Sequence, residues 1–139
     1  VDPLATPPPV EYADWYVVNA PVDRQIEGVW GDVDGTLLIS TMFTIYRSTD
    51  RGRSWQEVHK KQLGMFSVVE YRDTLFAMTT LVNLPKDRNV ICDPGDFSVD
   101  DGKTWQEYKA YNPALELPMI PGDFRFYINP VMASNGETY

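Results

Sequence analysis

Cysteine is nearly absent from this 139-residue chain, and the single Cys92 cannot form a disulfide within it. No run reaches the roughly 18–20 apolar residues that a membrane-spanning helix requires, so we expect no membrane insertion. Basic residues are also scarce, because 12 Lys and Arg stand against 20 Asp and Glu, a net charge of −8. Nucleic acids select basic surfaces, so we expect no nucleic-acid partner.

Sequence signals of phosphate binding, of a catalytic dyad and of helical structure are missing as well. The glycines stand at turns and form no phosphate-binding loop. His59 is the only histidine, and no spacing marks it and Cys92 as a catalytic dyad. No stretch of useful length has the apolar period of an amphipathic helix.

The first eleven residues are rich in proline and predict an extended linker over residues 1–11. They show no basic region followed by an apolar stretch, as a signal peptide would. We expect the linker to follow a cleaved leader or an expression boundary. Of the two we favour export, which would place the protein in the periplasm, at the cell surface or outside the cell.

Aromatic residues, by contrast, are plentiful, with four Trp, eight Tyr and six Phe, and this enrichment favours strands. An Asp34-Gly35 pair predicts a hairpin turn with positive φ, and the chain also turns at Arg72-Asp73. The predicted strands cover residues 12–18, 26–30, 36–42, 44–47, 54–58, 65–71, 74–80, 96–98, 104–108 and 126–132. Four strands thus occur twice and begin a third time, which predicts an all-β fold of antiparallel four-stranded units over residues 12–139.

Two turns share the pattern Ser-x-Asp-x-Gly-x-(Ser/Thr)-Trp, at residues 48–55 and 98–105. The Asp side chain can accept backbone N–H bonds across its own turn, Gly supplies a positive φ, and Trp adds an apolar anchor. These residue types predict a structural role rather than direct ligand binding. The positions concerned are Ser48, Asp50, Gly52, Ser54 and Trp55, and Ser98, Asp100, Gly102, Thr104 and Trp105.

The pattern resembles the Asp-box, or bacterial neuraminidase repeat, found in sialidases, sortilin-type receptors and xyloglucan-cleaving enzymes. The resemblance implies β-propeller blades, about two and a half of them in this chain. A propeller needs about four to eight blades. The chain would therefore be part of a larger propeller, which the stop within the third repeat favours, or copies would associate to complete one.

In that family the box lies between the third and fourth strands of a blade, on the face away from the ligand. The resemblance therefore implies a ligand face made by residues 59–64, 81–95 and 110–125. Aromatic faces near amide and carboxylate groups suit sugar binding. The candidate ligand-binding residues are Arg88, Asp93, Tyr111, Asn112, Asp123 and Arg125. We expect a non-catalytic binding module of an exported propeller, recognising carbohydrate or a protein partner.

The alternative is part of a sialidase-like glycoside hydrolase whose catalytic residues lie partly outside this chain. Sialidases hold a substrate carboxylate with three arginines, the first in a Phe/Tyr-Arg-Ile-Pro motif. The nearest string here, Phe124-Arg125-Phe126, lacks Ile-Pro and follows both turns. Arg24, Arg47, Arg72, Arg88 and Arg125 are available, but nothing in the sequence shows that three converge, so catalytic residues stay unassigned.

The second turn partly matches the spacing of a calcium-binding loop. Asp96, Ser98, Asp100 and Glu107 are spaced like the ligands of a helix-loop-helix calcium loop. Gly102, however, comes one place too late, flanking helices are not predicted, and the turn motif explains the same residues. We therefore expect no metal and no cofactor.

Overall fold

The computed structural model describes residues 2–8, 10–62, 64–80, 90–110, 117 and 118. Over these residues the fold is all-β, its strand pairs are antiparallel, and no helix occurs among them. The prediction of an all-β antiparallel fold is therefore confirmed for the described part of the chain.

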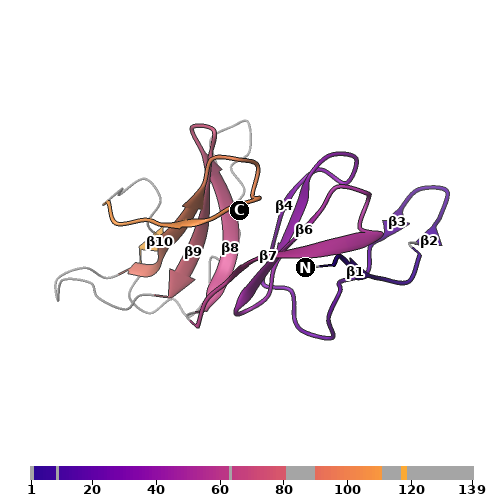
Figure 1. Ribbon diagram of the computed structural model, residues 1–139, viewed down its shortest axis with the longest axis horizontal. Helices are drawn as coiled ribbons and strands as arrows, with labels where there is room; N and C mark the ends of the chain where they lie inside the picture. Colours follow the sequence, from indigo (N-terminus) through magenta and orange to yellow (C-terminus); the bar gives the residue numbers. More distant parts are fainter. Residues whose placement is uncertain (1, 9, 63, 81–89, 111–116, 119–139) are drawn as a thin grey trace.

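Two sheets make up most of the structure and lie side by side (Figure 1). The first sheet has the order β1 (Leu4–Ala5), β7 (Ser54–Lys60), β6 (Thr44–Ser48), β5 (Leu37–Ser40), β4 (Gly28–Gly31). The second sheet has the order β11 (Gln106–Glu107), β10 (Val90–Ser98), β9 (Thr74–Thr80), β8 (Met65–Tyr71), and β12 (Leu117–Pro118) also pairs with β10. β2 (Val10–Glu11) and β3 (Tyr16–Val17) form a separate hairpin.

Side-chain alternation along the strands divides the core into three layers. Leu38 of β5 points into a cluster between the two sheets, together with Met65 and Val68 of β8. The neighbouring Leu37 and Ile39 point the other way, into a second cluster. Because its two faces are both covered, β5 is a nearly continuous apolar run, as the sequence predicted.

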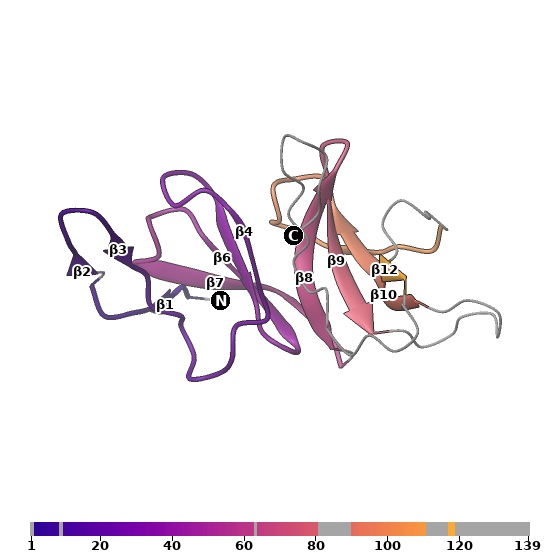
Figure 2. The same ribbon diagram turned by 180° about the vertical axis from the view of Figure 1, so that it is seen from behind.

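The second cluster lies on the face of the first sheet that is turned away from the second sheet. There, residues 18–22 of the N-terminal segment pack against Leu37, Ile39 and Trp55. Figure 2 shows the β2–β3 hairpin at this outer side of the first sheet. Residues 1–11, expected to be an extended linker, include β1, which pairs with β7, and β2, which pairs with β3.

The third cluster lies on the outer face of the second sheet. Phe76 and Met78 of β9 are its buried members. Partly buried residues packed against them are Phe66, Val69, Tyr71, Phe97 and Tyr108. The second sheet therefore carries apolar side chains on each of its faces.

The β4–β5 turn of the first sheet and the β8–β9 turn of the second sheet differ from one another. Arg72 and Asp73 both have positive φ, 50° and 59°, as a two-residue hairpin turn requires. At the first hairpin the positive φ, 105°, belongs to Gly31 instead of the predicted Asp34-Gly35 pair. Asp32 accepts a bond from the Gly35 N–H and donates its own N–H to Thr36 O, which makes a longer turn.

β10 begins earlier than predicted and contains a β-bulge. The sequence placed residues 81–95 in a loop because proline and glycine usually end strands. The pairing of β10 with β9 instead continues through Pro94 and shifts register before Asp96, so that Gly95 is the extra residue. A Cβ on Gly95 would lie 2.5 Å from Thr79 Oγ1, so the bulge requires glycine there.

The two sheets approach each other closely where β4 meets β8. A Cβ on Gly28 would lie 2.7 Å from Ser67 Cα and 2.8 Å from Phe66 O. Real Cβ atoms do not approach backbone atoms this closely, so Gly28 allows the two backbones to meet.

Candidate functional site

The two Ser-x-Asp-x-Gly turns contain the same internal hydrogen bonds. In the first turn (residues 48–55), Ser48 Oγ donates to Asp50 Oδ1 at 2.8 Å and accepts the Gly52 N–H at 2.9 Å. Asp50 then accepts the Ser54 N–H at 2.9 Å and the Ser54 hydroxyl at 2.6 Å. The corresponding four distances in the second turn (residues 98–105) are 2.8, 3.0, 2.9 and 2.6 Å.

These bonds hold both aspartates as carboxylates. Burial alone would raise the pKa of Asp50, but the bonds from Ser54 and Ser48 outweigh it and the pKa is lowered. The bonds that Thr104 donates lower the pKa of Asp100 to about 2. Each carboxylate is thus bonded within its own turn, where it stabilises the backbone.

Antiparallel connections place the two turns at one end of the sheets and a different set of loops at the other. At the opposite end, Thr41 and Thr44 close the β5–β6 turn through reciprocal backbone bonds of 2.9 and 3.4 Å. The link from β7 to β8 is joined to this turn, because Lys61 N–H donates to Phe43 O at 3.0 Å. Met65 N–H likewise donates to Met42 O at 2.7 Å. We call this region the far end.

Two adjoining pockets occupy the far end. One has a volume of about 160 Å³ and the other of about 540 Å³. Phe43, 39% exposed, and Lys60 line both of them. The remaining lining residues are Arg24, Thr41, Met42, Thr44, Tyr46 and Glu57 in the smaller pocket, and Lys61 and Gln62 in the larger one.

The far end combines hydrogen-bonding groups of every kind with apolar surface. Arg24 and Lys60 supply cationic donors, Glu57 supplies a carboxylate acceptor, and the threonine hydroxyls both donate and accept. Phe43 and Met42, the latter 47% exposed, supply apolar contact area. Three cations line these pockets in a chain whose net charge is −8, so the far end differs in charge from the molecule as a whole.

Lys61, which lines the larger pocket, belongs to a partly buried ion pair. Lys61 Nζ donates to Asp96 Oδ2 at 2.8 Å, and His59 Nε2 lies 3.2 Å from the same oxygen. Burial alone would raise the pKa of Asp96, but the neighbouring His59 together with the bond and charge of Lys61 outweigh it and lower the pKa. His59 also stacks on Trp105, with ring centroids 5.7 Å apart. This group joins β7 of the first sheet to β10 of the second.

The candidate ligand-binding residues of the sequence analysis fall mostly outside the described part of the chain. This applies to Arg88, Tyr111, Asn112, Asp123 and Arg125. Asp93 lies in β10, where its backbone pairs with Thr79, and not in a loop as expected. Of the predicted ligand face, residues 59–62, 64, 90–95, 110, 117 and 118 are described, and Lys60, Lys61 and Gln62 among them line the far-end pockets.

Sequence reasoning missed the contribution of Arg24 and of residues 41–44 to these pockets. The β5–β6 turn could have been found, because antiparallel pairing places it at the same end as the β7–β8 link.

The described arginines are engaged in separate places. Arg47 Nη2 lies 2.6 Å from Asp101 Oδ2, and the Arg72 guanidinium lies 5.2 Å from the centre of the Tyr71 ring. Neither lines a far-end pocket, whereas Arg24 does.

Among the residues that the structure describes, no three His, Cys, Asp or Glu side chains form a group that could hold a metal ion. Over the same residues, none of the structure forms a helix long and apolar enough to cross a membrane.

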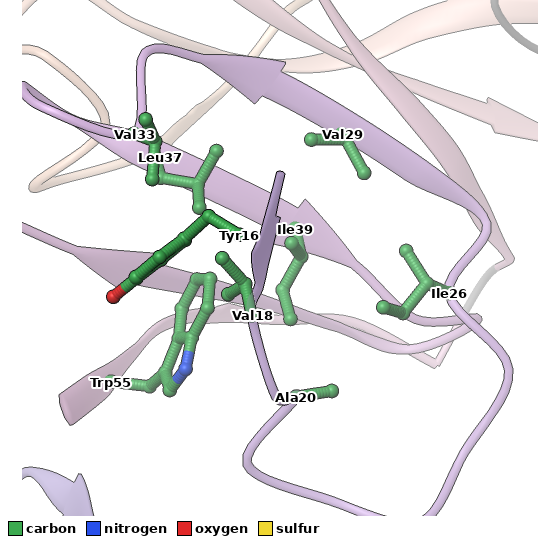
Figure 3. A pocket seen from close by; sticks show the side chains of 9 residues that line it. All are labelled: Tyr16, Val18, Ala20, Ile26, Val29, Val33, Leu37, Ile39 and Trp55. Atoms are coloured by element: carbon green, nitrogen blue, oxygen red, sulfur yellow. The ribbon is translucent and has the colours of Figure 1, made fainter. Parts of the chain in front are cut away.

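A third pocket, of about 330 Å³, lies between the N-terminal segment and the outer face of the first sheet (Figure 3). We call it the N-terminal groove. Its lining is almost entirely apolar, and Trp55 and Tyr16 stand on one side with Ile26 on the other. The other lining residues are Val18, Ala20, Val29, Val33, Leu37 and Ile39.

Comparison with known proteins gives no match to this chain among protein-family models, curated proteins or solved structures.

Proposed function

We propose that this chain is a non-catalytic binding module built from Asp-box β-propeller blades, and that its far end recognises carbohydrate. The observation that carries the proposal is the pair of adjoining pockets opposite the two turns. Loops at the end of a rigid sheet scaffold are where binding sites usually lie. An exported protein would meet such ligands, and export is part of the proposal.

The chemistry of the smaller pocket favours a sugar over a purely apolar ligand. Its volume of about 160 Å³ holds roughly five water molecules. A sugar can replace such waters because its hydroxyl groups both donate and accept hydrogen bonds. Arg24, Glu57 and Lys60 offer the complementary groups, and Phe43 offers an apolar surface for the face of a ring.

The repeated geometry supports the blade architecture. Two sheets with the same antiparallel order, each with the same turn at the same place, are what consecutive blades present. Both turns lie at the end away from the proposed site. On this proposal their residues support the scaffold and do not contact the ligand.

A glycan array probed with the intact chain tests the proposal. We expect binding to a subset of glycans, and a loss of about tenfold or more in affinity for Arg24→Ala or Lys60→Ala, because a charge-assisted bond disappears. Arg53→Ala is the matched control, since Arg53 is exposed at the turn end and its loss should leave affinity unchanged.

Three outcomes would overturn parts of the proposal. A folded protein that binds no glycan but captures one defined protein would replace carbohydrate by a protein ligand. Equal loss of affinity in Arg53→Ala and Lys60→Ala would remove the site from the far end. Release of fluorophore from a sialoside would show a hydrolase instead of a non-catalytic module.

A further inference from the structure

The two sheets present equivalent faces in the same direction. Leu37 pairs with Ser48 in the first sheet and Leu75 pairs with Ser98 in the second, which aligns the two repeats residue by residue. The face of the first sheet that contacts the second sheet therefore corresponds to the outer face of the second sheet. The matched positions are Trp30 with Val69, Leu38 with Phe76, Arg47 with Phe97, and Val58 with Tyr108.

The N-terminal segment reproduces part of this contact on the other side of the first sheet. Arg47 Nε donates to Asp101 O of the second turn at 2.9 Å, and Tyr16 Oη donates to the equivalent Arg51 O of the first turn at 2.8 Å. The turn glycines face equivalent neighbours too, because a Cβ would lie 2.8 Å from Leu38 at Gly102 and 2.4 Å from Val18 at Gly52. Tyr16 and Val18 thus stand where a preceding sheet would place the counterparts of Arg47 and Leu38.

The N-terminal segment covers only part of the outer face of the first sheet, and the N-terminal groove is the space that it leaves unfilled. Between the two sheets the space is filled by Leu38 and Ile45, with Trp30 and Val58 packed against them. Apart from Tyr16, the N-terminal segment offers only smaller side chains on a single stretch of chain, at residues 18, 20 and 22.

Exposure shows the consequence. Val68, in the contact between the sheets, is 5% exposed. Val29, its counterpart in the first sheet, is 56% exposed. The outer face of the first sheet is therefore shaped for a broader partner than the segment that covers it.

We propose that this broader partner is the outer face of the second sheet of another copy of the chain, which docks into the N-terminal groove and displaces the segment from Tyr16 to Val22. This head-to-tail assembly is independent of the proposed sugar site, which lies at the far end. Tyr108 of the incoming copy is only partly buried in its own chain, and its side chain is larger than that of Val58, which it replaces. It fills the groove that Val18 and Ala20 leave open.

The side chain that would take the position of Arg47 against the first turn indicates which surface docks there. Inside one copy, Arg47 forms an ion pair with Asp101 of the second turn. The first turn carries Arg51 at the Asp101 position, and the Arg51 guanidinium now lies 4.6 Å from the centre of the Tyr16 ring. A second arginine would be repelled there, whereas an aromatic ring attracts the guanidinium. The second sheet supplies that ring, because Phe97 holds the Arg47 position on its outer face.

Head-to-tail contacts of this kind are heterologous, so they close into a ring or grow into a filament. With the two larger sheets that the described residues form in each copy, a ring of four to eight sheets needs roughly two to four copies.

Light scattering coupled to size exclusion tests the assembly with the intact chain. We expect a mass of several times 15.9 kDa that rises with concentration. Phe97→Arg should shift the mass to that of one chain, because it sets two arginines against each other. Adding Arg51→Asp should restore the assembly, because the double variant installs between copies the Arg–Asp pair that joins the sheets inside one copy.

Arg53→Asp, in the same turn but outside the contact, is the charge-matched control and should leave the mass unchanged. Thermal melting of each variant checks that it is folded. A folded wild-type chain that stays at 15.9 kDa up to its highest soluble concentration would overturn the proposal. So would a folded Phe97→Arg variant that assembles normally, or a folded double variant that stays monomeric while Arg53→Asp assembles. None of these results bears on glycan binding, which the array measures separately.

Discussion

The two Ser-x-Asp-x-Gly turns are nearly identical inside and different outside. Their internal hydrogen bonds agree within 0.1 Å. The second turn packs against a sheet, where Arg47 and Thr36 donate to Asp101. The first turn packs against the N-terminal segment, where Thr6 Oγ1 donates to Gly52 O at 2.8 Å. The local sequence therefore determines the turn, and the surroundings determine what the turn stabilises.

The tryptophan that ends each turn shows the largest difference between them. Trp55 is fully buried against Leu37 and Ile39, and its Nε1 donates to Asn19 O at 3.0 Å. Trp105 is only partly buried, and its Nε1 donates to Gly102 O within its own turn at 3.1 Å. We expect Trp55→Ala to cost about 3–5 kcal/mol of unfolding free energy and Trp105→Ala distinctly less. Urea denaturation measures both, and equal losses would show that the two environments are equivalent.

The position two residues before each turn provides the second comparison. Asp96 of the second sheet corresponds to Tyr46 of the first, and it is 4% exposed and paired with Lys61. Asp96→Ala leaves that lysine without its partner, so we expect a loss of roughly 3 kcal/mol.

The same carboxylate gives a sign for the pH dependence. Its pKa is lowered in the folded state, so its stabilisation is present above the unfolded pKa of about 4 and is lost as the pH falls through the folded value. Asp96→Asn should therefore lose less stability than the wild type on acidification below about pH 4. Parallel acid-denaturation curves for the two proteins would contradict the assignment.

The smallest expected difference concerns the turn aspartates themselves. Asp50→Ala should cost about 1–3 kcal/mol, because the turn N–H and hydroxyl donors lose their acceptor. Asp100→Ala removes the same bonds where Thr104 is exposed and water can replace them, so its effect on the melting temperature should be smaller. Both variants should keep their glycan affinity. Lost binding with unchanged melting would instead give these carboxylates a ligand role.

Most strand positions were predictable from the sequence, whereas the conformation of the Asp34-Gly35 turn and features that depend on distant contacts were not. The strands Met65–Tyr71 and Thr74–Thr80 match their predicted bounds, because strand formers run between clear turn residues. The bulge at Gly95 was missed, since its fit against Thr79 depends on a strand 16 residues earlier.

The candidate site shows the same division. Lys60 ends β7 and Lys61 begins the β7–β8 connection, within residues 59–64 that the sequence predicts as part of the ligand face. The position of both lysines at the site was therefore predictable. Arg24 reaches the pocket through the path of the chain before β4, and Asp96 meets Lys61 only because two sheets pack together. No residue spacing in the sequence predicts either contact.

Gly28 has a geometrical consequence for any larger assembly. It lets β4 and β8 touch backbone to backbone, with no side chain between them. Further out, between β5, β6 and β7 and their neighbours, bulky side chains such as Leu38, Ile45 and Trp105 separate the layers. The interval between the sheets is therefore narrow at one edge and wide at the other, like a wedge. If copies of the chain stack head to tail as proposed, sheets separated by such a wedge would bend the stack around its thin edge, and the glycine at position 28 would contribute to that bend.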